Sequence, residues 1–386
     1  MAAAAALQLD EIVEEILLRF PPDDPARLLD AALVCKRWCR ILAAAGFRRR
    51  FRELHRTPPL LGFLGNIPHT NLSCAARFVP TSSFHPRRAD HIDWYALHSG
   101  HGRILFCNAP LCYGGLDMRF LVCDPITDER RVLPALGWCP FPSSANWNAL
   151  VLCAAGGGGG CNYLDCHRGP FLVFFVANLY DEVVASVYSS ATDAWSEPTS
   201  MLEPDGHRFC LWTKAQALVG NSLYIKYQTI GKLLKYDLPT REMSVIRLPA
   251  ECSKQHIVLM VMEDGRLGFA AAHDSRLYLW SREDGPNGDA GWVQLRVIEL
   301  RTLLPFHHLP ITPNVVGVAD GVGVIFIEFC GGIFTLDLKS KRIKKLEGSH
   351  VFCDGVLEIV PFMTFCTPEL GAARIGDGSG AGASSA

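Results

Sequence analysis

The segment YDLPTREM (residues 236–243) places a polar turn between two strand-like runs, with Asp at its second position and Thr at its fifth. The short oxygens of Asp and Thr can accept hydrogen bonds from nearby backbone N–H groups, so this pattern is typical of a tight turn. Related segments recur along the chain: CDPITDER from Cys123, YSSATDAW from Tyr188, LDLKSKRI from Leu336 and a version with a longer loop around Trp280. They begin roughly 44 to 65 residues apart, which brackets the ~40–50-residue spacing of propeller blades.

Short β-type runs such as FLVFFVAN and GVGVIFIE separate these turns, and helical periodicity is nearly absent beyond residue 60. This pattern predicts an all-β propeller of five or six four-stranded blades. We expect the closing segment VFCDGVLEIVPFMTFCTP (residues 351–368) to pair with the first blade. Such closure removes the exposed sheet edges that would otherwise favour aggregation.

The first sixty residues have a helical pattern instead. Apolar residues recur at helical spacing at Ile12, Val13, Ile16, Leu17 and Phe20. Asp24 and Pro25 predict the start of a second helix, and Gly46 offers an end to the helical segment. These helices carry more large apolar groups than short helices can bury among themselves, so the rest of the chain or a partner should cover the surplus.

The stretch LDEIVEEILLRFPPDDPARLLDAALVCKRWCRIL (residues 9–42) resembles the F-box, the helical module that docks substrate receptors onto a Skp-family adaptor in SCF (Skp–cullin–F-box) ubiquitin ligases. The family usually opens with Leu-Pro, whereas this chain has Gln8 and Leu9. That departure bears on the N-terminal edge of the adaptor contact. The segment GFRRRFRELHRTPPLLGF also resembles the continuation found in many plant F-box proteins.

The repeats are similar to the F-box-associated, kelch-like β-propeller domains of plant F-box proteins. Tyr188 to Trp195 resembles a degraded kelch blade, and Gly331 with Gly332 resembles the kelch double glycine. The resemblance implies a small all-α F-box module followed by an all-β propeller. It predicts three parts: an F-box helical module at residues 7–56, a propeller at residues 57–368, and a low-complexity, disordered tail at residues 369–386.

In the F-box family, apolar helix residues insert into the adaptor. The matching positions here are Leu9, Ile12, Ile16, Leu17, Leu28, Leu33, Val34, Cys35 and Trp38. A large aromatic residue beside aliphatic ones can act as a binding hot spot. The alternative for Trp38 is that it packs into the module's own core, and the two roles can overlap.

Charge, composition and apolar runs restrict the partners and the compartment. A net charge of −2 argues against a nucleic-acid protein, and the basic residues between 36 and 56 are interpreted as a solvated helix face and connecting segment. No apolar run approaches the ~20 residues that cross a bilayer, and the start lacks a signal-like n-region. The 15 cysteines are expected to be reduced thiols. We therefore expect a cytoplasmic or nuclear protein that binds neither nucleic acid nor membrane.

The sequence has no pattern that predicts a catalytic or metal site. Cys35 and Cys39 lack zinc-site spacing. The cluster Cys161, Cys166 and His167 lies beside a five-glycine run and has poor ligand geometry, and His307-His308 is interpreted as a surface turn. The recurring aspartates are interpreted as turn residues: Asp124, Asp237 and Asp337. No catalytic residue, cofactor or metal is predicted.

Propellers usually bind through loops on one face. The longest candidates are residues 84–96, 137–147, 203–212 and 304–313. Exposed Trp and Arg are typical of hot spots, so the candidate target-binding residues are Arg87, Arg88, Trp94, Trp147 and Trp212. The alternative for each tryptophan is packing between blades.

The function expected from the resemblance is that of a non-catalytic substrate receptor, with the F-box bound to the adaptor, and through it to cullin and RING subunits, and the propeller bound to an unknown protein target. One alternative is a propeller that binds a small molecule or is itself an enzyme, which predicts converging polar groups with shifted pKa values in its channel. Another is an F-box protein that acts outside a ligase.

Overall fold

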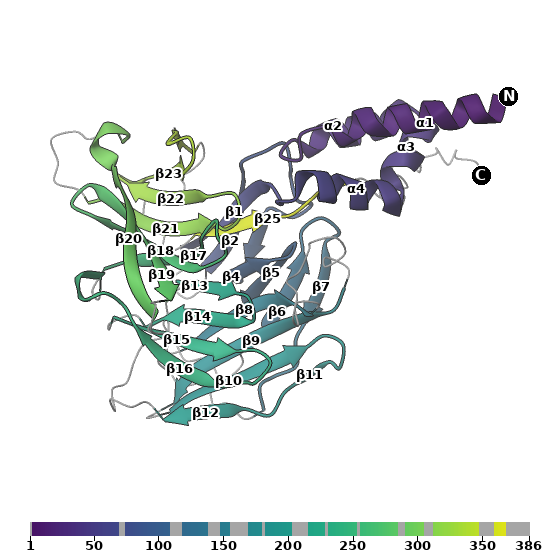
Figure 1. Ribbon diagram of the computed structural model, residues 1–386. Coiled ribbons are helices and arrows are strands. Elements are labelled where there is room, and N and C mark those ends of the chain that lie inside the picture. Colours follow the sequence, from purple (N-terminus) through teal and green to yellow (C-terminus); the bar gives the residue numbers. More distant parts are fainter. Residues whose placement is uncertain are drawn as a thin grey trace, which may run out of the picture.

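The computed structural model describes residues 2–68, 74–108, 118–137, 147–154, 169–179, 182–202, 215–227, 231–252, 255–284, 290–304, 312–346 and 359–367. Four N-terminal helices lie beside a ring of six β-sheets (Figure 1). None of the helices in the described part of the chain has the length and apolarity needed to span a membrane.

The four helices form a small module. They are α1 (Ala2–Leu18), α2 (Pro25–Val34), α3 (Lys36–Ala43) and α4 (Ala45–His55). Pro25 opens α2 as predicted. The predicted stop at Gly46 is wrong: Gly46 lies inside α4, because the chain bends two residues earlier, at the extended backbone of Ala44. The basic residues that follow therefore lie on a helix rather than in a connecting segment.

The apolar inner faces of the helices pack into one core. Its buried members are Leu17, Leu18, Leu28, Ala31, Leu42, Phe47, Phe51 and Phe365. Phe365 comes from the far end of the chain, and its ring meets that of Phe51 edge-on at 6.2 Å between centroids. The helical core is therefore completed by the propeller's last segment.

Each of the six sheets is one blade, and its strands are given from the channel outward. The first blade consists of β25 (Ile359–Met363), β1 (Leu60–Pro68), β2 (Cys74–Pro80) and β3 (Asp90–Ile92). The second consists of β4 (Tyr95–Gly100), β5 (Arg103–Cys107), β6 (Phe120–Asp124) and β7 (Glu129–Val132). The third consists of β8 (Trp147–Cys153), β9 (Phe171–Leu179), β10 (Glu182–Ser189) and β11 (Ala194–Trp195), and β12 (Thr199–Leu202) also pairs with β10.

The other three blades follow in chain order. They are β13 (Gln216–Val219), β14 (Ser222–Lys226), β15 (Lys232–Asp237), β16 (Met243–Arg247); β17 (Ile257–Val261), β18 (Leu267–His273), β19 (Arg276–Asp284), β20 (Ala290–Glu299); and β21 (Asn314–Ala319), β22 (Val324–Phe329), β23 (Gly332–Asp337), β24 (Ile343–Lys345). Two short 3₁₀ turns, Ala250–Cys252 and Leu300–Thr302, follow β16 and β20. The blade number agrees with the predicted range of five or six.

The ring closes through the two ends of the propeller. The C-terminal strand β25 pairs antiparallel with β1, with Ile359 opposite Gly65 and Pro361 opposite Phe63. Val360 and Phe362 are buried there against the second blade. The predicted pairing of the closing segment with the first blade is confirmed, so one blade is built from both chain ends.

The repeated polar segments form the turns between the third and fourth strands of their blades, as their chemistry predicts. Asp237 Oδ1 accepts bonds from the Thr240 N–H and hydroxyl, both at 3.0 Å. Asp124 and Asp337 accept from backbone N–H groups in the same way. The sixth position of four of these turns is left-handed, with φ between 53° and 60°: Asp128, Asp193, Arg241 and Lys341. The interpretation of the recurring aspartates as turn residues is confirmed.

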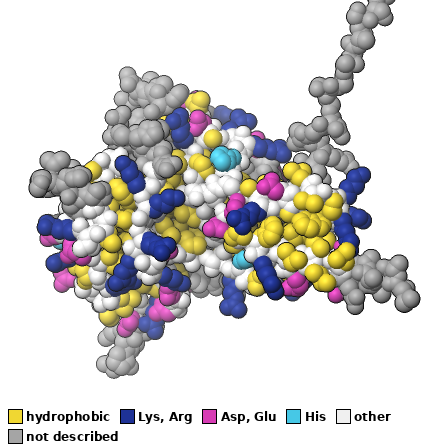
Figure 2. Space-filling view, turned by 90° about the horizontal axis from the view of Figure 1, so that it is seen from above, with side chains coloured by type: hydrophobic (Ala, Val, Ile, Leu, Met, Phe, Trp, Pro, Cys, Tyr) yellow, Lys and Arg dark blue, Asp and Glu magenta, His cyan; other side chains and the backbone are white. Residues whose placement is uncertain are grey.

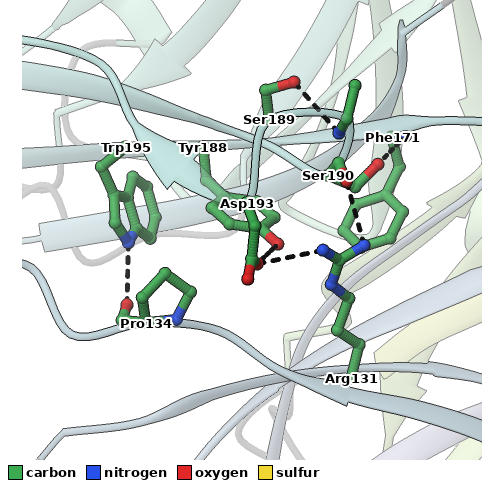
Figure 3. A network of polar contacts seen from close by, with 9 residues as sticks. Arg131, Pro134, Phe171, Tyr188, Ser189, Ser190, Asp193 and Trp195 are labelled. Carbon is green, nitrogen blue, oxygen red and sulfur yellow. Dashed lines mark hydrogen bonds and ion pairs between the residues drawn. The ribbon is translucent and has the colours of Figure 1, made fainter.

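The same turns tie neighbouring blades together (Figure 3). Arg131 of β7 donates to the Ser190 carbonyl at 3.1 Å and forms an ion pair with Asp193 at 3.0 Å, and the Tyr188 hydroxyl also donates to Asp193. Trp195 donates from its indole N–H to the Pro134 carbonyl at 2.8 Å.

Similar contacts join the fifth blade to both of its neighbours. Trp292 donates to the Arg247 carbonyl, and Arg296 donates to the Leu338 carbonyl, each at 2.8 Å. Side-chain donors thus bond backbone carbonyls of a neighbouring blade at three interfaces of the ring, between blades two and three, four and five, and five and six.

Candidate functional sites

An apolar surface covers the outer side of the helical module. It consists of Leu9, Ile12 and Ile16 on α1 and Leu29, Leu33 and Val34 on α2, all classed as exposed. Figure 2 shows hydrophobic side chains gathered over this module with charged side chains at the margin. The spacing of three and four residues places the α1 members on one helix face. We call these six residues the helical apolar surface.

Seven of the nine predicted adaptor residues lie on this surface or beside it. Five of them belong to it, and Cys35 is exposed at the start of α3. Cys35 Sγ accepts a hydrogen bond from the Trp38 N–H at 3.5 Å and so caps the helix. Trp38 itself is half-buried and packs against the helical core, so both roles considered for it remain available.

Two predicted residues are not surface residues. Leu17 and Leu28 have 0% and 1% of their area exposed and belong to the core of the module. Their neighbours Ile16 and Leu29 are the ones turned outward. The sequence analysis missed Leu29, although its spacing of four residues from Leu33 is the signal that places the two on one face of α2.

Ion pairs hold the helices in this arrangement. Arg37 of α3 pairs with Asp10 of α1, and Arg50 of α4 pairs with Glu14 and Glu15 of α1. These pairs are partly exposed, so each adds little stability, but together they fix α1 against α3 and α4. The basic stretch is thus in part a helix face bound to the acidic face of α1.

The module contacts the propeller at one end of the ring. Ser83, between β2 and β3, accepts a bond from the Ala26 N–H at the start of α2 and donates to Asp24 Oδ1 at 2.6 Å. Asp24 therefore bonds the propeller rather than capping its own helix. Because β25 runs toward the helices before Phe365 (Figure 1), the module lies at the end where the innermost strands terminate.

Three of the four predicted target loops join the outer strands of one blade to the innermost strand of the next: β7 to β8, β12 to β13 and β20 to β21. Innermost strands begin at the end of the channel away from the helical module. The described strand ends therefore place the attachment points of these loops on the free end of the propeller.

The predicted target residues have different surroundings. Arg87 and Arg88 are exposed between β2 and β3, and Arg88 lies 3.9 Å from Asp128. Trp147 is 9% exposed and packs against Phe120 and Phe175, which confirms packing between blades as its role.

Trp94 is partly buried against the apolar core that joins the first two blades. Other candidates lie outside the described residues: Trp212, Cys161, Cys166, His167, His307, His308, the glycine run 156–160 and the tail 369–386. Within the described ranges, no group of three or more His, Cys, Asp or Glu residues is arranged to hold a metal ion.

The propeller channel contains a cavity of about 760 Å³. Residues of the six innermost strands line it, and each of these strands pairs on one side only, so its other edge faces the channel. Two of the free edges are capped by side chains from a neighbouring blade. His98 accepts from the Val151 N–H, and Asp320 accepts from the Val261 N–H, each at 3.3 Å.

Buried polar groups converge on this cavity, as the small-molecule alternative predicts. Burial raises the pKa of Asp320 to about 7 and lowers the pKa of Lys226 below its ordinary value. Burial also lowers the pKa of His101. Val, Leu and Ile are the most frequent residues of the lining, and its other polar residues include Ser99, Gln216, Gln255, His256 and Asn314.

Two family models match the chain. Residues 10–50 match the F-box domain, and residues 97–370 match the β-propeller of F-box proteins like AT5G49610. No curated protein matches the sequence.

Solved structures similar to the chain are remote from it. The dihydro-haem d1 dehydrogenase NirN has a TM-score of 0.36 and 10% identity over 75% of this chain, which spans 54% of that protein. A prolyl endopeptidase has a TM-score of 0.35 and 12% identity over 72% of this chain and 38% of its own length. The Dos1 propeller has a TM-score of 0.37 and 9% identity over 72% of this chain and 68% of its own length.

Proposed function

This chain belongs to the F-box proteins whose propeller is AT5G49610-like, and from that premise we propose that it is a substrate receptor of an SCF-type ubiquitin ligase. The helical apolar surface would bind a Skp-family adaptor, which connects the receptor to cullin and RING subunits. The propeller would hold a protein target. The chain itself would be non-catalytic, and it would act in the cytosol or nucleus by raising the effective concentration of target lysines near a ubiquitin-carrying enzyme.

The helical apolar surface is the observation that carries this proposal. Leu33 is 81% exposed, and Ile12 and Ile16 are more than half exposed, on a module whose opposite face is fully buried. A contiguous exposed apolar surface of this kind is typical of an interaction site. The match of residues 10–50 to the F-box domain indicates which partner it suits.

The free end of the propeller is the better candidate for target binding. If the adaptor lies on the helices, the ends of β7, β12 and β20 remain accessible on the other side of the ring. Arg87 and Arg88 stay proposed target residues nearer to the module, because both are exposed. The target would then lie on the propeller, and the other ligase subunits would be attached through the adaptor on the helices.

Co-expression with a Skp-family adaptor followed by co-purification tests the adaptor contact. We expect the wild type to retain the adaptor and the double variant Ile12→Glu/Leu33→Glu to bind at least about 100-fold more weakly, because it places two charges in an apolar contact. Leu202→Glu is the matched control, since Leu202 is 70% exposed but lies on β12 of the propeller.

Circular dichroism and limited proteolysis would establish that all three proteins are folded. A wild type that binds no adaptor, or a folded double variant that binds as well as the control, would overturn the proposed contact. A wild type that binds the adaptor but never co-purifies cullin would favour an F-box protein acting outside a ligase.

A further inference from the structure

A single carboxyl group lies at the end of the propeller channel nearer to the helical module. Asp320 follows the innermost strand β21 and lines the channel cavity. Its Oδ1 accepts the Val261 N–H of the neighbouring innermost strand β17 at 3.3 Å. Innermost strands pair on one side only, so this N–H belongs to an edge that faces the channel. The carboxyl therefore lies at the channel wall.

The second oxygen of this carboxyl is open to the cavity. Asp320 remains partly exposed. In the part of the chain that the structure describes, its Oδ2 accepts no hydrogen bond and has no ion-pair partner, and it is not shielded from solvent as the buried, unpaired side-chain atoms are. A ligand in the channel can therefore reach this oxygen.

The described residues around Asp320 bring no compensating positive charge to it. Burial raises its pKa to about 7, and against this only the Val261 N–H lowers it among these residues. Lys226, the sole Lys or Arg of the described lining, lies at the opposite end of the channel and bonds the Gln255 carbonyl. His101 lines the same end as Asp320, but burial lowers its pKa, which favours the uncharged ring. Because an unpaired buried charge is costly, a cation in the cavity would stabilise the carboxylate.

The geometry of the carboxyl restricts the kind of cation. A guanidinium group usually binds a carboxylate through both oxygens, and Oδ1 of Asp320 is already bonded. A divalent metal ion needs several oxygen ligands, and the described residues contain no cluster of such ligands. An ammonium group is a compact charge that can bind through one oxygen. A single open oxygen thus suits an ammonium group best.

The wall of the cavity beside Asp320 is apolar. Val318 precedes Asp320 by two residues, and residues two apart on a strand share a face. Val261 and Met363 also line this end of the cavity. The cavity volume of about 760 Å³ lies within the range of small-molecule sites. Such surroundings suit a ligand with a hydrocarbon body attached to its charged group.

We propose that the propeller channel binds a small apolar monoamine, with its ammonium group on Asp320 Oδ2 and its hydrocarbon body against the Val, Leu and Ile side chains of the lining. The ammonium group supplies the positive charge that the described residues around the carboxyl lack. Its presence would favour the ionised carboxyl, since a nearby opposite charge stabilises the charged form.

Calorimetric titration of the full chain with a fixed panel tests this site. The titrations are made at about pH 8, above the Asp320 pKa of about 7. Isoamylamine, cyclohexylmethylamine and phenethylamine carry one ammonium group and an apolar body, whereas isoamyl alcohol lacks the charge, putrescine has a second charge in place of the apolar end, and ammonium chloride lacks the body. We expect at least one of the three apolar amines to bind one-to-one, and the other three compounds to bind at least tenfold more weakly.

Three variants locate the binding. Asp320→Asn removes the charge but keeps an acceptor for the Val261 N–H, and it should weaken the best amine at least tenfold. Val318→Lys should do the same, because it brings a competing ammonium group to the carboxyl, and it provides a second variant should Asp320→Asn fail to fold. Glu263→Gln is the matched control and should bind like the wild type. Glu263 lies at the same end of the propeller, pairs with Lys339 at 3.4 Å and is not part of the described cavity lining.

Thermal unfolding would establish that all three variants are folded. The proposal is overturned if none of the three apolar amines binds, or if folded Asp320→Asn binds the best amine like the wild type. Putrescine that binds as tightly as the best amine, with the same dependence on Asp320, would make the channel a general cation site and would equally refute the proposal. Because none of these measurements involves the adaptor, they are independent of the proposed ligase function.

Discussion

The helical module and the propeller bury their apolar residues to very different extents. Among the described residues, thirteen large apolar side chains are exposed; seven lie in the first 55 residues, and six lie on the much longer propeller, one each on β3, β7 and β12 and three on β20. Each blade of the ring has a neighbour on both sides, so both faces of its sheet find apolar cover. The helical module is covered on one side only.

This difference shows what covers the apolar surface of each region. The propeller supplies its own last surface by closing β25 onto β1, and it even lends Phe365 to the core of the helices. A module of some 50 residues is marginal when alone. The outer face of the module is therefore available to a partner protein. In the propeller, the channel is the surface that stays open.

Removing the closing strand should have the largest effect. A chain ending at residue 358 loses Ile359, Val360, Phe362 and Phe365, all buried. Each large apolar residue contributes roughly 2–5 kcal/mol, and together they exceed the stability of a typical protein. We expect no cooperative thermal unfolding transition and aggregation through the freed edge of β1.

The matched control is a chain ending at residue 368, which keeps β25 and removes the segment that the sequence predicts to be a disordered tail. We expect its melting temperature to equal that of the wild type. A folded, monomeric chain ending at 358 in size-exclusion chromatography would show that ring closure is dispensable.

Within the helical module, the inner and outer faces should respond in opposite ways. Leu17→Ala should lower the free energy of unfolding by about 2–5 kcal/mol, because Leu17 is fully buried. Leu33→Ala should change it by less than about 0.5 kcal/mol yet weaken adaptor binding by about tenfold or more. Denaturant unfolding and an adaptor titration would measure both, and equal stability losses for the two variants would break the comparison.

The fold was predictable where its determinants are local. The turns at Asp124, Asp237 and Asp337 can be recognised in the sequence, because the side-chain oxygen of each aspartate accepts hydrogen bonds within its own turn. Counting such turns predicted five or six blades. The prediction that the helix ends at Gly46 was wrong because local sequence signals locate helix ends poorly. The boundary lies at Ala44, whose backbone is extended.

The sites were predictable only in part. The family resemblance assigned Leu17 and Leu28 to the adaptor contact and left out Leu29, because a matching position does not say which of two neighbouring helix residues faces the core. The channel cavity has no spacing signal, because closure of the ring brings its lining residues together from six different blades.

The carboxyl of Asp320, at the helical end of the channel, predicts a pH dependence. Burial holds the folded-state pKa of Asp320 at about 7, above the value near 4 of an unfolded aspartate. Its contribution to stability is therefore fully present below about pH 4 and is lost as the pH rises to about 7, by roughly 1–4 kcal/mol. Asp320→Asn cannot ionise and keeps an acceptor for the Val261 N–H.

We therefore expect the difference in melting temperature between Asp320→Asn and the wild type to grow in favour of the variant between pH 5 and pH 7.5. Thermal unfolding in a pH series measures it. A difference that stays constant over this range would mean that Asp320 titrates near its ordinary pKa and is hydrated in the channel.

The smallest effect should come from the turn residue Asp124, and it separates a structural oxygen from a functional charge. Asp124→Ala removes the acceptor of the Ile126 and Thr127 N–H groups and should cost about 1–2 kcal/mol, while Asp124→Asn should cost less than half of that. Ser189, at the same position of its repeat, accepts the Ala191 N–H with a hydroxyl, so the turn requires a short oxygen rather than a carboxylate. Denaturant unfolding would measure both losses in the free energy of unfolding. Equal losses in the two variants would instead assign the role to the negative charge of Asp124. Burial raises the pKa of that carboxyl, and the nearby Arg103 lowers it.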